Sequence, residues 1–146
     1  MATGKTGNTT VQCAINVKKE QRFLEHMEKY FVYGSLRSGE FNWRRLGLIP
    51  DNVVAKAYMK GVELYSLGAY PALYVNGDPN DVVVGEIQVY EPETEHTIDR
   101  MEREAGYVKS VGEATDEQGT SHKVSFYCFD ERPEAEKVPS GDWFTR

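Results

Sequence analysis

Short runs of β-branched and aromatic residues, broken by glycine, proline and asparagine, make up most of the chain, and only one segment has the pattern of a full helix. The run Tyr30–Tyr33 predicts a buried strand that enters a turn at Gly34-Ser35. Val82–Tyr90 predicts the strongest strand. Pro92–Ala105 predicts the helix, because it begins with a proline and acidic residues and is followed by the helix stop Gly106.

The other segments fill in the same picture of strands with a few inserted helices. The remaining expected elements are a short helix at Glu40–Leu46, a bent or bulged strand at Val53–Tyr65, a loop at Gly68–Tyr74 around Pro71, and strands at Tyr107–Val111 and Lys123–Phe129. No internal repeat is present, and 146 residues is the length of one ordinary domain. We therefore predict one antiparallel-rich α+β domain over residues 30–146.

Residues 1–29 are expected to form an N-terminal extension that is partly flexible. Within it, Val11–Val17 alternates weakly like a strand, and Gln21–Lys29 has helical spacing. The chain has no run of about 18 apolar residues, which excludes a membrane-spanning helix. The polar start lacks the apolar segment of a secretory signal. We expect the protein to be cytoplasmic.

Charge and cysteine content narrow the function classes. Seventeen basic against 23 acidic residues give a formal charge of -6. Binding to a nucleic acid backbone needs a clustered positive surface, so we expect no nucleic acid partner and no membrane partner. The two cysteines, Cys13 and Cys128, are too few for a disulfide framework and indicate free thiols.

Metal and thiol chemistry are disfavoured by spacing. The three histidines are scattered, and neither cysteine has a partner at the CxxC spacing of a metal site, so we expect no metal. Cys128 lies in an aromatic strand-like run, which favours a buried, inert thiol. Ser35 follows a strand in a loop that could present backbone N–H groups to an anion, although a plain turn residue fits the local sequence equally well.

Glu102 is the first candidate for general acid/base chemistry. It follows Ile98 by four residues and precedes Ala105 by three, so helical geometry places it beside the apolar stripe. Partial desolvation would raise its pKa toward neutrality, as a general acid/base requires. The alternative is a rim glutamate that pairs with Arg103 or Arg100.

Glu86 is the competing carboxylate. Strand alternation puts it opposite Ile87 and Val89, either on a polar face or lining a cavity. The residues alone do not decide between Glu86 and Glu102.

Several stretches follow one another along the chain in a characteristic order. They are Phe31-Val32-Tyr33-Gly34-Ser35-Leu36, Gly61-Val62-Glu63-Leu64-Tyr65, Gly68-Ala69-Tyr70-Pro71-Ala72-Leu73, Val84-Gly85-Glu86, Ile98-Asp99-Arg100-Met101-Glu102, Tyr107-Val108-Lys109 and Ser140-Gly141-Asp142-Trp143. Together they resemble the γ-glutamylcyclotransferase-like family, which includes γ-glutamylamine cyclotransferases and plant AIG2-like proteins. Lys109 stands where the family usually has arginine.

The resemblance implies a fold and a reaction. The fold is a small mixed β-barrel with flanking helices. In the reaction, the free α-amine of a γ-glutamyl group attacks its own γ-carbonyl, which closes 5-oxoproline and expels an amine or amino acid. The attack is intramolecular, so no cofactor or metal is implied. The resemblance selects Glu102 over Glu86 as the catalytic acid/base.

The same resemblance implies the binding site for a small γ-glutamyl substrate. Backbone N–H groups of Gly34, Ser35 and Leu36 would hold the substrate carboxylate or the developing oxyanion. Candidate pocket walls are Tyr33, Tyr70, Tyr107 and Tyr127, and a plain core role is open for each. The alternative to an enzyme is a binding module of the same fold that captures a small acidic ligand or a protein partner. The leaving amine and the oligomeric state do not follow from the sequence.

Overall fold

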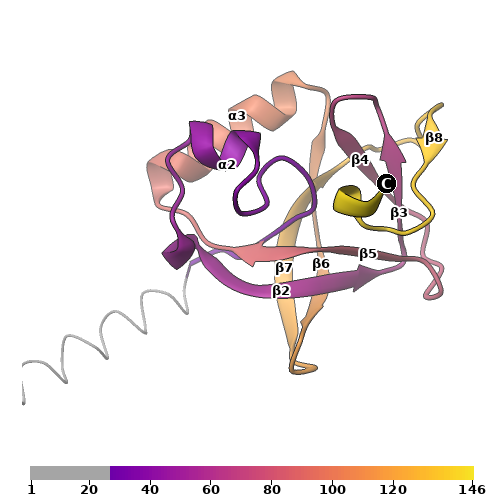
Figure 1. Ribbon diagram of the computed structural model, residues 1–146, viewed down its shortest axis with the longest axis horizontal. Helices are drawn as coiled ribbons and strands as arrows, with labels where there is room; N and C mark the ends of the chain where they lie inside the picture. Colours follow the sequence, from indigo (N-terminus) through magenta and orange to yellow (C-terminus); the bar gives the residue numbers. More distant parts are fainter. Residues whose placement is uncertain (1–26) are drawn as a thin grey trace, which may run out of the picture.

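A closed β-barrel dominates the computed structural model, which describes residues 27–146 (Figure 1). Its strands, in spatial order, are β1 (Tyr30–Val32), β5 (Val82–Gln88), β2 (Val53–Lys60), β6 (Val108–Asp116) and β7 (Ser121–Cys128). β1 is antiparallel to β5 but parallel to β7, where Tyr30 pairs with Ser125 and closes the barrel. The small mixed barrel expected from the resemblance is thus confirmed. The strand expected at Val11–Val17 and most of the pattern at Gln21–Lys29 lie outside the described residues.

A second sheet lies beside the barrel, with β3 (Val62–Ser66) between β4 (Pro71–Val75) and β8 (Glu136–Lys137), all antiparallel. The single bent strand expected at Val53–Tyr65 is therefore wrong, because the chain changes sheets at Gly61. Gly61 has a φ of 80°, a conformation that favours glycine.

The helices gather at one end of the barrel (Figure 1). They are α2 (Phe41–Arg45) and α3 (Pro92–Glu104), with the 3₁₀ turns η1 (Pro50–Asn52) and η2 (Trp143–Thr145) elsewhere in the chain. α3 begins with Pro92 and carries Glu93 and Glu95 in its first turn, where they complement the helix dipole. No helix among the described residues is long and apolar enough to cross a membrane.

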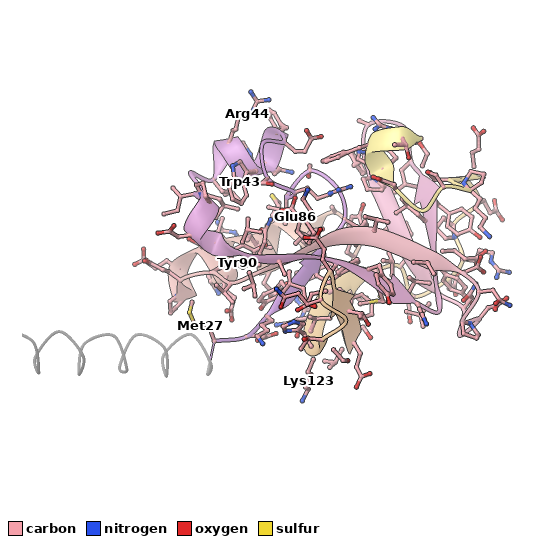
Figure 2. The ribbon with its side chains drawn as sticks, turned by 60° about the horizontal axis from the view of Figure 1, so that its bottom comes forward. Met27, Trp43, Arg44, Glu86, Tyr90 and Lys123 are labelled. Carbon is pink, nitrogen blue, oxygen red and sulfur yellow. The ribbon has the colours of Figure 1, made fainter. Side chains whose placement is uncertain are left out.

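Two hydrophobic clusters hold these layers together. One fills the barrel, and its members include Phe31, Met59, Ile87 and Phe126. The other lies beneath the helices, and its members include Tyr30, Trp43, Tyr90 and Ile98. Figure 2 shows Trp43 and Tyr90 among these packed side chains and Arg44 pointing outward from α2.

Ile98 sets the orientation of α3. It is the buried residue of the helix, with 1% of its surface exposed. Side chains four residues apart lie on the same helix face, so burying Ile98 turns Glu102 toward the same side of the molecule. The apolar stripe of the sequence thereby positions a carboxylate at the end of α3.

Candidate active site

A cavity of about 570 Å³ opens between the loop after β1, helix α2, the start of β4 and the last turns of α3. Its walls include every residue that the sequence predicts for the site: Tyr33, Gly34, Ser35, Leu36, Tyr70, Glu102, Tyr107 and Tyr127. These residues come from five separate segments of the chain, and the fold brings them to one place. Their roles remain predictions.

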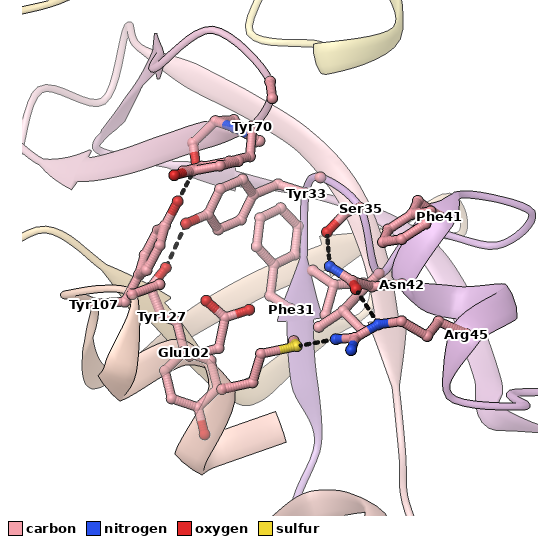
Figure 3. A pocket seen from close by; sticks show the side chains of 17 residues that line it. Phe31, Tyr33, Ser35, Phe41, Asn42, Arg45, Tyr70, Glu102, Tyr107 and Tyr127 are labelled. Atoms are coloured by element: carbon pink, nitrogen blue, oxygen red, sulfur yellow. Dashed lines mark hydrogen bonds between the residues drawn. The ribbon is translucent and has the colours of Figure 1, made fainter. Parts of the chain in front are cut away.

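Glu102 is the carboxylate of this cavity, and Figure 3 shows it pointing into the open space. Burial raises its pKa from 4.5 to about 7. Among the described residues, no hydrogen bond or ion pair reaches its side chain. The neighbouring Arg103 pairs with Asp99 at 3.0 Å, so the rim pair considered for Glu102 is not formed with Arg103. The result is a carboxyl group that titrates near neutrality and faces a ligand-sized space.

The loop after β1 has a backbone arrangement suited to anions. Its carbonyl oxygens accept internal hydrogen bonds, Gly34 from the Arg37 amide at 3.0 Å and Ser35 from the Asn42 amide at 3.0 Å. The Leu36 carbonyl accepts from Gln88 Nε2 at 2.9 Å. Within residues 27–146, the amides of Gly34, Ser35 and Leu36 have no acceptor. Three consecutive unpaired N–H groups beside a cavity are a typical anion site.

Glu86 supports this loop and does not line the cavity. It is 4% exposed and accepts hydrogen bonds from the Ser38 amide at 3.0 Å and the Ser38 hydroxyl at 2.9 Å. Gln88 Nε2 also donates to it at 3.0 Å, and the Tyr90 hydroxyl in turn holds Gln88 at 2.6 Å. The carboxylate is therefore the buried acceptor of a network that fixes the loop.

The four tyrosines differ in how their hydroxyls are used. Tyr33 donates to the Tyr127 carbonyl at 2.5 Å and Tyr107 to the Pro71 carbonyl at 2.5 Å (Figure 3). Burial raises the pKa of both, so these hydroxyls stay protonated and remain donors. Tyr127 donates to Asp99 at 2.8 Å. Tyr70 is 50% exposed. Tyr33, Tyr107 and Tyr127 thus combine a packing role with a place in the cavity wall.

Helix α2 adds cavity residues that sequence reasoning missed. Phe41, Asn42 and Arg45 line the cavity, and Asn42 Nδ2 donates to the Ser35 hydroxyl at 2.6 Å. The sequence predicts the short helix but not which of its residues face the cavity, because a five-residue helix has too few positions to show a periodicity. Lys109, the residue that replaces the family's usual arginine, lies outside the cavity and binds the Tyr30 hydroxyl at 2.9 Å.

Thiol and metal sites were the other possibilities that the sequence raised. Cys128 is buried in the barrel cluster, and burial raises the pKa of its thiol, which keeps it protonated. Within residues 27–146, no three His, Cys, Asp or Glu side chains gather in a way that could hold a metal ion. The carboxyl group of Glu102 and the loop amides, to which the sequence analysis assigns the chemistry, lie together in this cavity.

A family model described as "Gamma-glutamyl cyclotransferase, AIG2-like" matches residues 30–145, which contain the barrel and the whole cavity. The chain belongs to this family. Membership in the AIG2-like γ-glutamyl cyclotransferases confirms the resemblance read from the sequence. The match includes the loop after β1, Glu102 and the C-terminal Gly141-Asp142-Trp143.

Solved structures share the AIG2-like fold. An uncharacterised protein from Pyrococcus horikoshii is 22% identical with a TM-score of 0.62, and the alignment covers 81% of this chain and 91% of that one. An AIG2-like protein from Mus musculus is 20% identical with a TM-score of 0.65, covering 81% and 88%. A structure described as a γ-glutamyl cyclotransferase is 18% identical with a TM-score of 0.59, covering 78% and 73%. At these identities the likeness shows the fold. No curated protein sequence matches the chain significantly.

Proposed function

We propose that the protein is a cyclotransferase that converts a γ-glutamyl amine or γ-glutamyl peptide to 5-oxoproline and a free amine. The observation that carries the proposal is the placement of Glu102, with its pKa near 7, in the same cavity as the unpaired amides of Gly34, Ser35 and Leu36. Family membership supports the same reaction class. A general acid/base and an oxyanion site are the two groups that this reaction needs.

The reaction begins with a proton transfer. The Glu102 carboxylate removes a proton from the substrate α-ammonium, and the freed nitrogen lone pair attacks the γ-carbonyl carbon. A carboxyl group with a pKa of about 7 is closer in pKa to an amine than an ordinary glutamate is, so the proton transfer costs less free energy. The carbonyl electrons move to oxygen, which becomes the anion of a tetrahedral intermediate.

The second half of the reaction returns the proton. The amides of the loop stabilise the oxyanion. Glu102 gives its proton to the leaving nitrogen, and the ionised carboxylate then removes the second proton that the attacking nitrogen still carries. The oxygen re-forms its double bond while the bond to the leaving nitrogen breaks, and the departing amine takes this second proton from Glu102 and leaves as an ammonium. The sequence consumes no water and leaves Glu102 ionised for the next cycle. The main task of the cavity is to fold the substrate so that its amine lies near its own carbonyl.

An assay of purified protein with a panel of γ-glutamyl amines and γ-glutamyl dipeptides tests the proposal. We expect release of 5-oxoproline from at least one of them, measured by mass spectrometry. Binding of the substrates without any 5-oxoproline would instead support the binding module that the sequence left open. Release from none of them and binding of none would also overturn the proposal.

The pH dependence of the reaction gives a second prediction. The base must be ionised to accept a proton, so kcat/KM should rise by about tenfold per pH unit below the Glu102 pKa and level off above it. We expect the bend at a pH of about 7. Initial rates at low substrate concentration across pH 5 to 9 measure it. A bend near 4.5, the ordinary value for a glutamate, would contradict a partly desolvated Glu102 as the base.

A further inference from the structure

Arg45, the last residue of α2, is the positive charge of the cavity. The charged side chains among the lining residues are Arg45 and Glu102. The protein as a whole has a formal charge of -6, so Arg45 is a local positive charge in a molecule whose net charge is negative. Such a local charge has its largest effect on a ligand group that comes directly against it.

Neutral groups hold this guanidinium in place. Its Nε donates to Asn42 Oδ1 at 3.1 Å, and its Nη2 donates to Met101 Sδ at 2.9 Å (Figure 3). Arg45 therefore connects α2 to α3 at Met101, the residue that precedes Glu102. In the described part of the chain no carboxylate lies within ion-pair distance of it. A guanidinium has five N–H donors in a flat fork, so donors remain for a carboxylate.

The location of Arg45 indicates which substrate group reaches it. Arg45 is exposed, and its neighbour Phe41, whose ring lies 5.9 Å from the guanidinium, is 68% exposed. The γ-glutamyl part must lie against Glu102 and the loop amides, because the ring closes there. The leaving group has to depart toward solvent, so it extends to the open side of the cavity, where Arg45 lies.

We propose that Arg45 binds a carboxylate on the leaving group, so that the preferred substrates are γ-glutamyl amino acids and peptides with a free carboxylate rather than uncharged or cationic γ-glutamyl amines. The inference rests on the proposed function and narrows its substrate class. A planar pair of N–H donors matches a carboxylate, and the same positive charge repels an amine that carries its own cation.

Two substrates that differ only in this carboxylate test the inference. They are γ-glutamyl-alanine and γ-glutamyl-ethylamide, whose leaving groups are alanine and ethylamine. We expect the wild type to prefer γ-glutamyl-alanine in kcat/KM by about tenfold, as a charge-assisted hydrogen bond provides. Arg45→Met should bring the ratio of the two kcat/KM values close to one, and Arg45→Lys should retain part of the preference.

Arg44→Met is the matched control, since Arg44 precedes Arg45 on α2, is exposed and points outward from the helix (Figure 2). It is not among the residues that line the cavity. The substitution should leave the ratio unchanged. Release of 5-oxoproline with a ratio that Arg45→Met does not alter would overturn the inference and leave the proposed function intact. Release from neither of these two substrates while another member of the panel reacts would overturn the inference alone, and a panel in which nothing reacts would overturn both.

Discussion

Replacing Glu102 by glutamine is expected to lower kcat by about 10²–10⁴-fold, the usual contribution of a positioned general acid/base. Glutamine has nearly the same shape as glutamate and cannot exchange a proton near neutral pH. The cavity walls and the loop amides stay in place, so substrate binding should change much less than kcat. Steady-state kinetics on the best substrate of the panel measure the split between kcat and KM.

Glu86→Gln is the comparison that separates a role in the reaction from a role in holding the loop in place. Glu86 holds the Ser38 amide and hydroxyl, so an amide nitrogen in its place puts a donor against donors and disturbs the loop. Activity is expected to fall in this variant too. The bend in its pH profile should nevertheless stay at about 7, because Glu102 is unchanged. Wild-type activity in Glu102→Gln, or a lost bend in Glu86→Gln, would show that the base is assigned to the wrong carboxylate.

Stability provides a readout of Glu102 that needs no substrate. The pKa of this group is raised in the folded protein, from 4.5 to about 7, so the folded state binds the proton more tightly than the unfolded state does. The contribution of this one group to wild-type stability is then fully present below pH 4.5 and is lost between 4.5 and 7 as the partly buried carboxyl group ionises. Glu102→Gln lacks this loss. Chemical denaturation should therefore show that the free energy of unfolding of Glu102→Gln rises relative to that of the wild type between pH 4.5 and 7.

The sequence predicted the elements whose pattern is local. β1 and β5 are runs of apolar residues bounded by turn residues, and α3 has a start signal, a stop signal and one apolar stripe. Each pattern reflects burial that the element itself experiences. β4 was expected to be a loop because Pro71 lies at its start, but it pairs with β3 from Ser66↔Pro71 onward. Proline is accepted at the first position of a strand, and only the long-range pairing reveals that it is one.

The residues of the candidate site also fall into those that a sequence pattern predicts and those that only the three-dimensional structure reveals. Glu102 and the Gly34–Leu36 loop could be selected because they lie in stretches that resemble a family. Arg45 and Asn42 carry no such pattern. Their place in the cavity follows from contacts made in three dimensions, since Asn42 donates to Ser35 and Arg45 reaches Met101 of α3. Glu86 could not be separated from Glu102 by residue pattern, since both are glutamates beside apolar residues. Their difference lies in partners, because Glu86 has donors around it and Glu102 has an open cavity.

Gly34→Ala is expected to cost about 100-fold in kcat/KM through displacement of the loop amides, the scale of effect that a shift of about 1 Å has at an active site. A Cβ at this position would lie 2.6 Å from Pro71 Cγ and 2.9 Å from Pro71 Cδ. The proline ring is rigid and begins β4, so it cannot move aside as a flexible side chain would. The loop must shift instead, away from β4, so that its amides no longer have the correct position relative to Glu102.

A second substitution distinguishes displacement from general damage. Pro71→Ala removes the two ring atoms that the new Cβ meets and keeps the carbonyl that accepts the Tyr107 hydroxyl. In the double variant Gly34→Ala/Pro71→Ala the loop can return, so kcat/KM should recover much of the loss seen in Gly34→Ala, measured against Pro71→Ala alone as a double-mutant cycle. Additive losses would mean that Gly34 acts on the reaction by another route than its contact with Pro71. Coupled losses would assign the position of the oxyanion loop to the contact between Gly34 and the start of β4.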